Sequence, residues 1–460
     1  GLLVLAFALL PPMVHDTHLY YTQSIIWDET YPVVPGIGNM HGRLGFNSNL
    51  LLMSAAFSVK DLFGFRVFGL LSLFTIVLYA WIIAGISTHK SVWVRLALSF
   101  FIFAFLFLYH LSLSSPSTDP FPNMLVAFVL IRAILDKDAL QHSPLVFWLL
   151  PVFCLTLKLS VAPLCLLSLL LCYYIIKEKQ YRSLVVFTLL ALFILVPWCA
   201  RNVIITGYLI YPFPAIDIFN VDWKIPIDLV QIEKGLVSSW AKMPGLPLDK
   251  FEAMPFWEWA AVWLLRHIRY MQFYIFTFCL AGLSPFAMCW LKAKLNVKVS
   301  PLQVTAWIVG VAGSIFWFFM APDVRFGFSF ILMAGLVPLF LAPIPLGKTG
   351  LNKIVATAMI VSLFYFLWPL YKLYDDTIGT KPLVSYLYSP QSVGTVEKAI
   401  YPVLFPNVIA VYTEHKIGNT TVYISNTGFC YEYCFPCMPY GARTLEMRGD
   451  RIEDGFRVKK

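Results

Sequence analysis

The sequence contains few charged residues. Of its 460 residues, 13% are charged and 59% are apolar, and the mean hydropathy is +0.74. A water-soluble domain usually carries about 25% charged residues. The composition therefore excludes an ordinary soluble globular enzyme and predicts a chain that lies largely in a membrane.

The first residues lack the features of a secretory signal peptide. Residues 1–10 are apolar throughout, without a basic region and without a small-residue cleavage site. We therefore interpret residues 1–14 as part of a spanning helix, in a chain that is truncated at its start.

Long apolar runs recur along the rest of the chain. A helix that crosses a bilayer needs about 20 mostly apolar residues. The runs lie at about 1–14, 64–86, 96–112, 122–135, 144–157, 161–176, 183–200, 271–290, 302–320, 326–343 and 354–372. They predict a mainly α, polytopic membrane protein with about 10–11 transmembrane helices.

The excess of positive charge has a simple explanation in such a protein. The chain carries 34 Lys and Arg against 25 Asp and Glu, a formal charge of +9. Five of the predicted short loops hold twelve bases: Lys90, Arg95, Arg132, Lys137, Lys177, Lys179, Arg182, Lys292, Lys294, Lys298, Lys348 and Lys353. The same loops hold only three acids, Asp136, Asp138 and Glu178. Because Lys and Arg concentrate in cytoplasmic loops, these loops are predicted to face the cytoplasm, and the charge does not predict a nucleic-acid partner.

The opposite, extracytoplasmic side then receives the long segments. We predict a transmembrane domain over 1–372, with extracytoplasmic loops 15–63 and 201–258, and a small extracytoplasmic β-rich or α+β domain over 373–460. Alternating apolar residues at 408–412 and 421–424 indicate strands in that last domain. Residues 256–270 have Trp and Arg at amphipathic spacing, which fits either a helix in the headgroup plane or an aromatic belt at the start of a span.

Three of the nine cysteines lie together in this C-terminal segment. Cys430, Cys434 and Cys437 offer either a zinc site or a disulfide with one thiol left over. We favour the disulfide, because three closely spaced thiols without a nearby His are a poor ligand set for zinc and because disulfides persist in oxidising compartments.

Asp16 is the first candidate for chemistry. It follows the first apolar run, at the predicted outer mouth of the membrane, where ionisable residues often have a function. Its carboxylate is either a general base that removes a proton from an attacking hydroxyl or a cap for the helix that begins near Leu19.

The first long loop is rich in hydrogen-bonding groups. Residues 35–49 contain His41, Arg43 and Asn47 among four glycines. This density suits recognition of a sugar or a phosphate, and it also suits a tight structural loop. The glycine spacing matches no nucleotide-binding motif.

Further polar residues fall at the same predicted face of the membrane. They are Asp119, Lys158, Arg201, Asn202, Asp323 and Arg325. Lys158, Arg201 and Arg325 together would form a phosphate clamp, because Arg binds phosphate with two hydrogen bonds and Lys acts as a point charge. The alternative is that Asp323 and Arg325 simply pair with each other or with neighbours.

At these residues the sequence resembles the GT-C superfamily of integral-membrane glycosyltransferases. That superfamily has an Asp or Asp-Glu in the first extracytoplasmic loop, usually followed by aromatic residues, as Asp16 is by Tyr20 and Tyr21. The resemblance is closest to a group of bacterial multi-spanning proteins without an assigned activity, in stretches that cover nearly the whole chain: 34–39, 41–48, 323–327, 436–440 and 448–450. The chain departs from the Asp-Glu pattern at Thr17, and Asp28-Glu29 is a competitor for the role.

The resemblance implies a glycosyltransferase that moves a sugar from a polyprenyl-phosphate-linked donor to a glycan, lipid or protein acceptor. Asp16 would be catalytic. The substrate would be bound by Tyr20, His41, Arg43, Asn47, Asp119, Lys158, Arg201, Asn202, Asp323 and Arg325. No cofactor is certain, although Mg or Mn would be able to assist the leaving phosphate. The protein would lie in the bacterial inner membrane among membrane lipids, with its active site and C-terminal domain outside the cytoplasm. A transporter or flippase, a polymerase or ligase of lipid-linked glycans, and a structural scaffold are the alternatives.

Overall fold

The protein was analysed as a computed structural model and is mainly helical. The structure describes residues 1–343 except 11, 13, 64 and 65, then residues 353, 356–357, 360–368 and 370–371, and finally residues 412–459 except 427, 431–433 and 440–443.

Seven helical segments in the described part are long and apolar enough to cross a membrane. They contain α5 Leu70–Thr88, α6 Val92–Tyr109, α10 Leu166–Lys177 with the preceding turn η5 Leu159–Cys165, α11 Tyr181–Thr206, α15 Gln272–Leu295, α16 Pro301–Met320 and α17 Val324–Leu341. Two shorter apolar helices, α7 Pro120–Leu135 and α9 Pro144–Leu157, pack among them. The prediction of a mainly α, multi-spanning chain is confirmed at this level.

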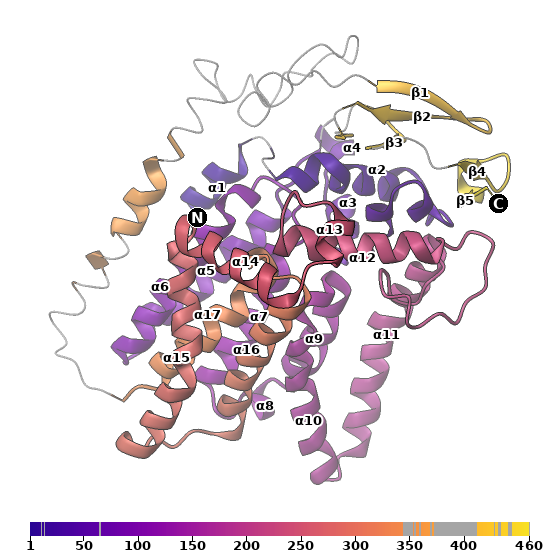
Figure 1. Cartoon of the computed structure of the whole chain (residues 1–460). Helices are drawn as coiled ribbons and strands as arrows, with labels where there is room; N and C mark the ends of the chain where they lie inside the picture. Colours follow the sequence, from indigo (N-terminus) through magenta and orange to yellow (C-terminus); the bar gives the residue numbers. More distant parts are fainter. Residues whose placement is uncertain are drawn as a thin grey trace.

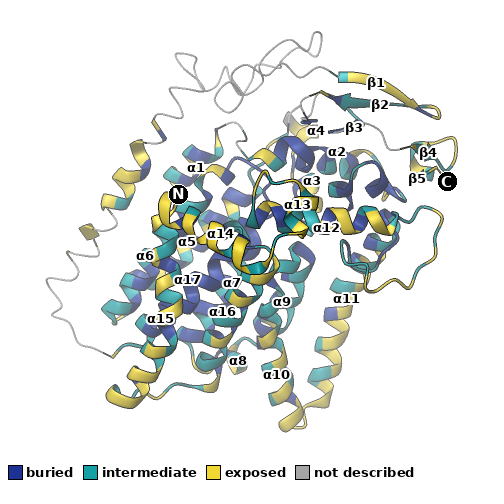
Figure 2. Cartoon of the chain, viewed as in Figure 1, coloured by how far each residue is buried: buried dark blue, intermediate teal, exposed yellow. Residues whose placement is uncertain are grey.

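The helices form one bundle in which burial differs sharply between members. Most residues of α17 are buried, whereas α11 exposes large apolar side chains from Tyr181 to Val196 (Figure 2). The predicted run 1–14 contains the short helix α1 Leu2–Ala8. The predicted run 354–372 lies partly outside the described residues.

The two ends of the bundle are different. At one end the helices are joined by short connections, including α8 Ala139–His142 and the tight turn between α10 and α11 (Figure 1). The opposite end carries the long loops. The first loop folds into η1 Thr17–Tyr21, α2 Thr22–Thr30, η2 Ile37–Asn39, η3 Gly42–Gly45, α3 Asn49–Ala56 and α4 Lys60–Phe63.

The second long loop is also largely helical. It contains α12 Ile227–Lys242, α13 Leu248–Glu252 and α14 Phe256–Tyr270. Helix α14 buries Trp259, Trp263 and His267 against the bundle and exposes Trp257 and Leu265. Residues 256–270 therefore form an amphipathic helix of their own, which is one of the two alternatives that the sequence left open.

The described part of the C-terminal segment contains short strands. They are β1 Tyr412–Ile417, β2 Thr420–Ser425, β3 Cys437–Met438, β4 Leu445–Met447 and β5 Phe456–Val458. Strands β1 and β2 form an antiparallel hairpin, β3 joins β2 in parallel, and β4 pairs with β5. The strand expected at 408–412 lies outside the described residues except for Tyr412, and the first described strand continues to Ile417.

The strands dock on the long loops through specific contacts. The backbone N–H of Phe456 donates to the carbonyl of Pro35 at 2.9 Å. Arg448 and Arg457 both pair with Asp222, at 2.8 and 3.2 Å. Contacts between residues more than 200 positions apart thus hold the end of the chain over the first and second loops.

Candidate functional site

A cavity of about 460 Å³ lies beneath the long loops, between the first loop, η5, α11, α12 and α16. Most of its wall is apolar, from residues such as Leu155, Phe316 and Phe319. Six of the predicted site residues line it: Asp16, Tyr20, Arg43, Asn47, Lys158 and Asn202.

Asp16 occupies a distinctive position in this wall. It precedes η1, a π-helical turn in which the N–H of Thr22 donates to the carbonyl of Thr17, and Tyr20 and Tyr21 on that turn also line the cavity. Within the described part of the chain, the Asp16 carboxylate makes no capping hydrogen bond, so the capping role considered for it is absent.

The environment of Asp16 keeps it ionised. Burial alone would raise the pKa of its carboxyl, but hydrogen bonding from His15 and the positive charges of Arg325 and Arg43 outweigh burial and lower that pKa. Its closest basic atom is Nδ1 of His15, 3.6 Å from Oδ1. A carboxylate is therefore present at the edge of an apolar cavity at neutral pH.

Asp119 lies behind the wall and is buried, with 2% of its side chain exposed. It pairs with Lys158 and, at 3.5 Å, with Arg325. Arg325 also pairs with Asp323 at 2.9 Å, and the carbonyl of Arg325 accepts hydrogen bonds from Tyr109 and Asn123. The interpretation that Asp323 and Arg325 pair with each other is therefore confirmed, within a larger network.

Arg201 belongs to a different cluster. It donates to Asp28 and to the Oδ1 of Asn47, both at 2.5 Å. Asn47 and Trp198 hold each other by two hydrogen bonds of 2.7 and 2.8 Å, which fix the first loop to α11. Lys158, Arg201 and Arg325 thus each have a carboxylate partner, and the structure does not gather them as three free cations of one phosphate clamp.

The competing pair Asp28-Glu29 is also engaged in ion pairs. Burial raises the pKa of Asp28 more than Arg201 lowers it, and Glu29 pairs with Arg66 at 2.7 Å. His41 begins η3, where its Nδ1 accepts a hydrogen bond from the N–H of Arg43 at 3.2 Å. These residues support the loop around the cavity.

Helix α12 supplies site residues that the sequence did not suggest. Glu233 pairs with Arg43 at 2.5 Å, while Lys234, Val237 and Ser238 line the cavity. The Lys234 ammonium lies 5.5 Å from the ring centre of Phe213. The helical spacing of Val230, Lys234 and Val237 within the predicted loop 201–258 was the available signal.

The described residues do not fit a metal site. No group of three or more His, Cys, Asp or Glu side chains is arranged to hold an ion in the part of the chain that the structure describes. Cys430 is joined to Cys437, and Cys434 remains a free thiol.

Comparison with known proteins identifies a family and no individual relative. No curated protein and no solved structure matches the chain. One family model, described as "Domain of unknown function (DUF8201)", matches residues 1–332, a range that contains every residue lining the cavity. The chain therefore belongs to this family.

Proposed function

We propose that the protein is a GT-C-type glycosyltransferase of the bacterial inner membrane. It transfers a sugar from a polyprenyl-phosphate-linked donor to a glycan, lipid or protein acceptor on the extracytoplasmic side. In this proposal the seven long helices, the shorter α1, α7 and α9, and residues 354–372 make up the 10–11 crossings.

The observation that carries the proposal is the placement of Asp16. Its ionised carboxylate lines a largely apolar cavity and, in the described part of the chain, no Lys or Arg lies within 4 Å of it. A structural carboxylate is normally capped or paired, as Asp119 is. Asp16 is thus the carboxylate best placed to act on a substrate.

The reaction follows from these groups. The Asp16 carboxylate accepts the proton of the acceptor hydroxyl, and the acceptor oxygen forms a bond to the anomeric carbon of the sugar. The bond between that carbon and the phosphate oxygen breaks, and its electron pair leaves with the polyprenyl phosphate. The apolar wall accommodates the polyprenyl chain, and Lys234, which has no ion pair among the described residues, provides positive charge for its phosphate. We assign no step to a metal ion.

Two features support the proposed orientation. The long loops lie at the end of the bundle opposite to the short, base-rich connections (Figure 1), and residues of both loops line the cavity. The Cys430–Cys437 disulfide belongs to the same end, and disulfides persist mainly outside the cytoplasm.

The test compares three forms of the full chain: wild type, Asp16→Asn, and Asp249→Asn as a control at an exposed carboxylate on α13. Membranes that contain each form are incubated with a panel of radiolabelled polyprenyl-phosphate sugars, and labelled product is separated from donor. We expect Asp16→Asn to lower the transfer rate about 10²- to 10⁴-fold, because a general base contributes that much, and Asp249→Asn to retain it.

Near-normal transfer by Asp16→Asn would reject the catalytic assignment. Movement of labelled donor between the leaflets of liposomes by the purified wild type, without release of polyprenyl phosphate, would instead favour a flippase.

A further inference from the structure

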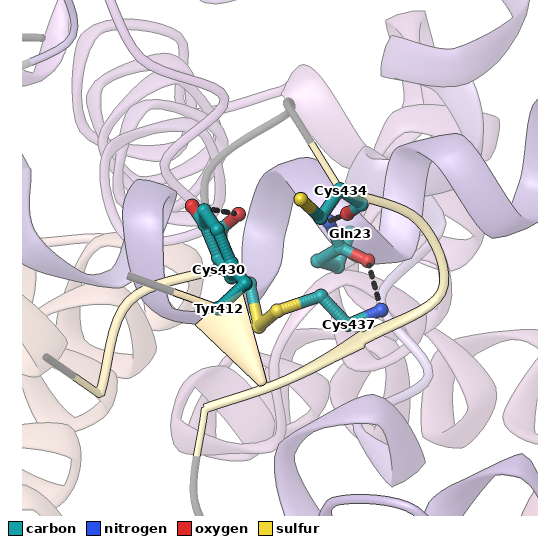
Figure 3. The surroundings of a disulfide bond; sticks show 5 residues. All are labelled: Gln23, Tyr412, Cys430, Cys434 and Cys437. Carbon is teal, nitrogen blue, oxygen red and sulfur yellow. Dashed lines mark hydrogen bonds between the residues drawn. A yellow bond between two sulfur atoms is a disulfide. The ribbon is translucent and has the colours of Figure 1, made fainter. Parts of the chain in front are cut away.

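The C-terminal disulfide lies directly on the segment that carries Asp16. The bond joins Cys430 to Cys437 and closes a short ring of the chain, which we call the disulfide ring (Figure 3). Both cysteines are buried, with at most 1% of each residue exposed. Cys430 and Cys437 are therefore packed into the protein, more than 400 residues away in sequence from the residues of η1 and α2 that they contact.

The first set of contacts is with η1. The backbone N–H of Cys430 donates to the carbonyl of His18 at 2.9 Å. The ring of the preceding Phe429 lies edge-on to the imidazoles of His15 and His18, at 4.8 and 6.4 Å between ring centres. The residues that flank Asp16 on both sides thus contact this one segment.

The second set of contacts is with α2. The Gln23 side chain, 1% exposed, donates from Nε2 to the carbonyl of Cys434 at 2.9 Å and accepts at Oε1 from the N–H of Cys437 at 3.1 Å (Figure 3). Phe435 packs against Trp27 at 4.9 Å between ring centres. One buried amide therefore binds two backbone groups of the ring, which must keep a fixed spacing for both bonds to form.

The turn held in this way is an unusual one. A π-helical turn is rare and occurs often at functional sites. In η1 both the N–H and the hydroxyl of Thr22 bond to the carbonyl of Thr17, and the turn presents Asp16, Tyr20 and Tyr21 to the cavity. Contacts between η1 and the C-terminal segment can stabilise the π-helical geometry relative to that of an ordinary α-helical turn.

We propose that the disulfide ring positions Asp16, because it fixes the backbone of η1 and the start of α2. The bond holds Cys430 and Cys437 together, so the backbone N–H groups that donate to His18 and Gln23 are already spaced correctly before docking. Asp16 acts on the substrate, and the ring acts only through Asp16. The effect on turnover rests on the proposed function, whereas the effect on backbone order does not.

The first experiment measures amide hydrogen exchange in the full chain, without substrate, for wild type, the double variant Cys430→Ser/Cys437→Ser and Cys434→Ser as the matched control. We expect exchange in residues 17–23 to be at least ten-fold faster in the double variant and unchanged in Cys434→Ser. Peptides from α16 and α17 should exchange as in wild type. Equal exchange of residues 17–23 in all three proteins would overturn the proposal.

A second variant covers the case in which the double variant does not fold. Gln23→Ala keeps the disulfide and removes both side-chain bonds to the ring, so it should also speed exchange in residues 17–23. Unchanged exchange in Gln23→Ala would count against the proposal.

Turnover measurements distinguish a ring that positions Asp16 from a ring that only stabilises the fold. With the polyprenyl-phosphate sugar that wild type uses, the folded variant should lose at least ten-fold in kcat with KM within two-fold, because most of the cavity wall that binds the donor lies outside η1. A rise in KM at constant kcat would contradict positioning of Asp16. If wild type turns over no donor, the proposed function fails, while faster exchange in the variants still supports the ring as the element that orders η1.

Discussion

Three aspartates near the cavity differ in the number of Lys or Arg side chains that pair with them. Asp119 has two partners, Lys158 and Arg325, and Asp28 has one, Arg201. For Asp16 the described residues provide none within 4 Å, only His15. Three aspartates at one end of the bundle therefore have three different electrostatic environments.

The number of basic partners distinguishes the carboxylates that stabilise the fold from the carboxylate that can take part in a reaction. A buried carboxylate with two basic partners is committed to them, because loss of either leaves a charge uncompensated in a medium of low dielectric constant. A carboxylate that is held ionised by more distant charges can still exchange a proton with a bound molecule. The effect of each substitution on the free energy of unfolding should therefore follow the number of partners, and the effect on turnover should not.

Asp119→Asn should cause the largest loss of stability. It leaves Lys158 without its carboxylate and removes one of the two carboxylates that pair with Arg325, which costs about 3–5 kcal/mol for a buried pair. The free energy of unfolding can be measured by denaturant titration in mixed micelles. As a control, Asp119→Asn combined with Lys158→Met should lose less than the sum of the two single substitutions. Additive losses would show that the two side chains do not interact.

Asp28→Asn should have a smaller effect, of about 1 kcal/mol. The amide oxygen can still accept the hydrogen bond from Arg201, and Asn47 keeps its own bond to Arg201. Burial also raises the pKa of Asp28, so the ionised form is only partly compensated in the folded protein. The same denaturant titration tests this prediction, and a loss as large as that of Asp119→Asn would break the proposed order.

The spanning helices could be predicted from the sequence because a bilayer imposes a length and a composition on each of them. The runs at 183–200 and 302–320, for example, fall inside α11 and α16. The position of Asp16 beside the cavity was also accessible, since it follows an apolar run and precedes two tyrosines.

The partners of the polar residues could not be predicted in the same way. The bond of Cys430 to the carbonyl of His18 and the pairing of Arg43 with Glu233 join segments that are far apart in the sequence. Such contacts depend on how the loops pack. The sequence of a loop has no periodicity from which its neighbours in the fold could be predicted. The clamp of Lys158, Arg201 and Arg325 stays a prediction: each base is paired with a carboxylate whose position depends on the fold, and of the three only Lys158 lines the cavity.

Asp16→Asn should have the smallest effect on stability, within about 0.5 kcal/mol at neutral pH, because no direct pair with Lys or Arg is broken in the described structure. Since the folded state lowers the pKa of Asp16, its carboxylate contributes a small stabilisation that is present above the ordinary Asp value of about 3.9 and is lost as the pH falls through the lower, folded value. The difference in unfolding free energy between wild type and Asp16→Asn should thus remain above pH 5 and vanish in stronger acid. Both proteins contain His18, whose pKa burial lowers to about 4, so its titration cancels in the difference. A difference that instead disappears between pH 5 and 7 would mean that Asp16 is protonated near neutrality, and the carboxylate would then be a proton donor in the cavity and not the base that the comparison with Asp119 assigns to it.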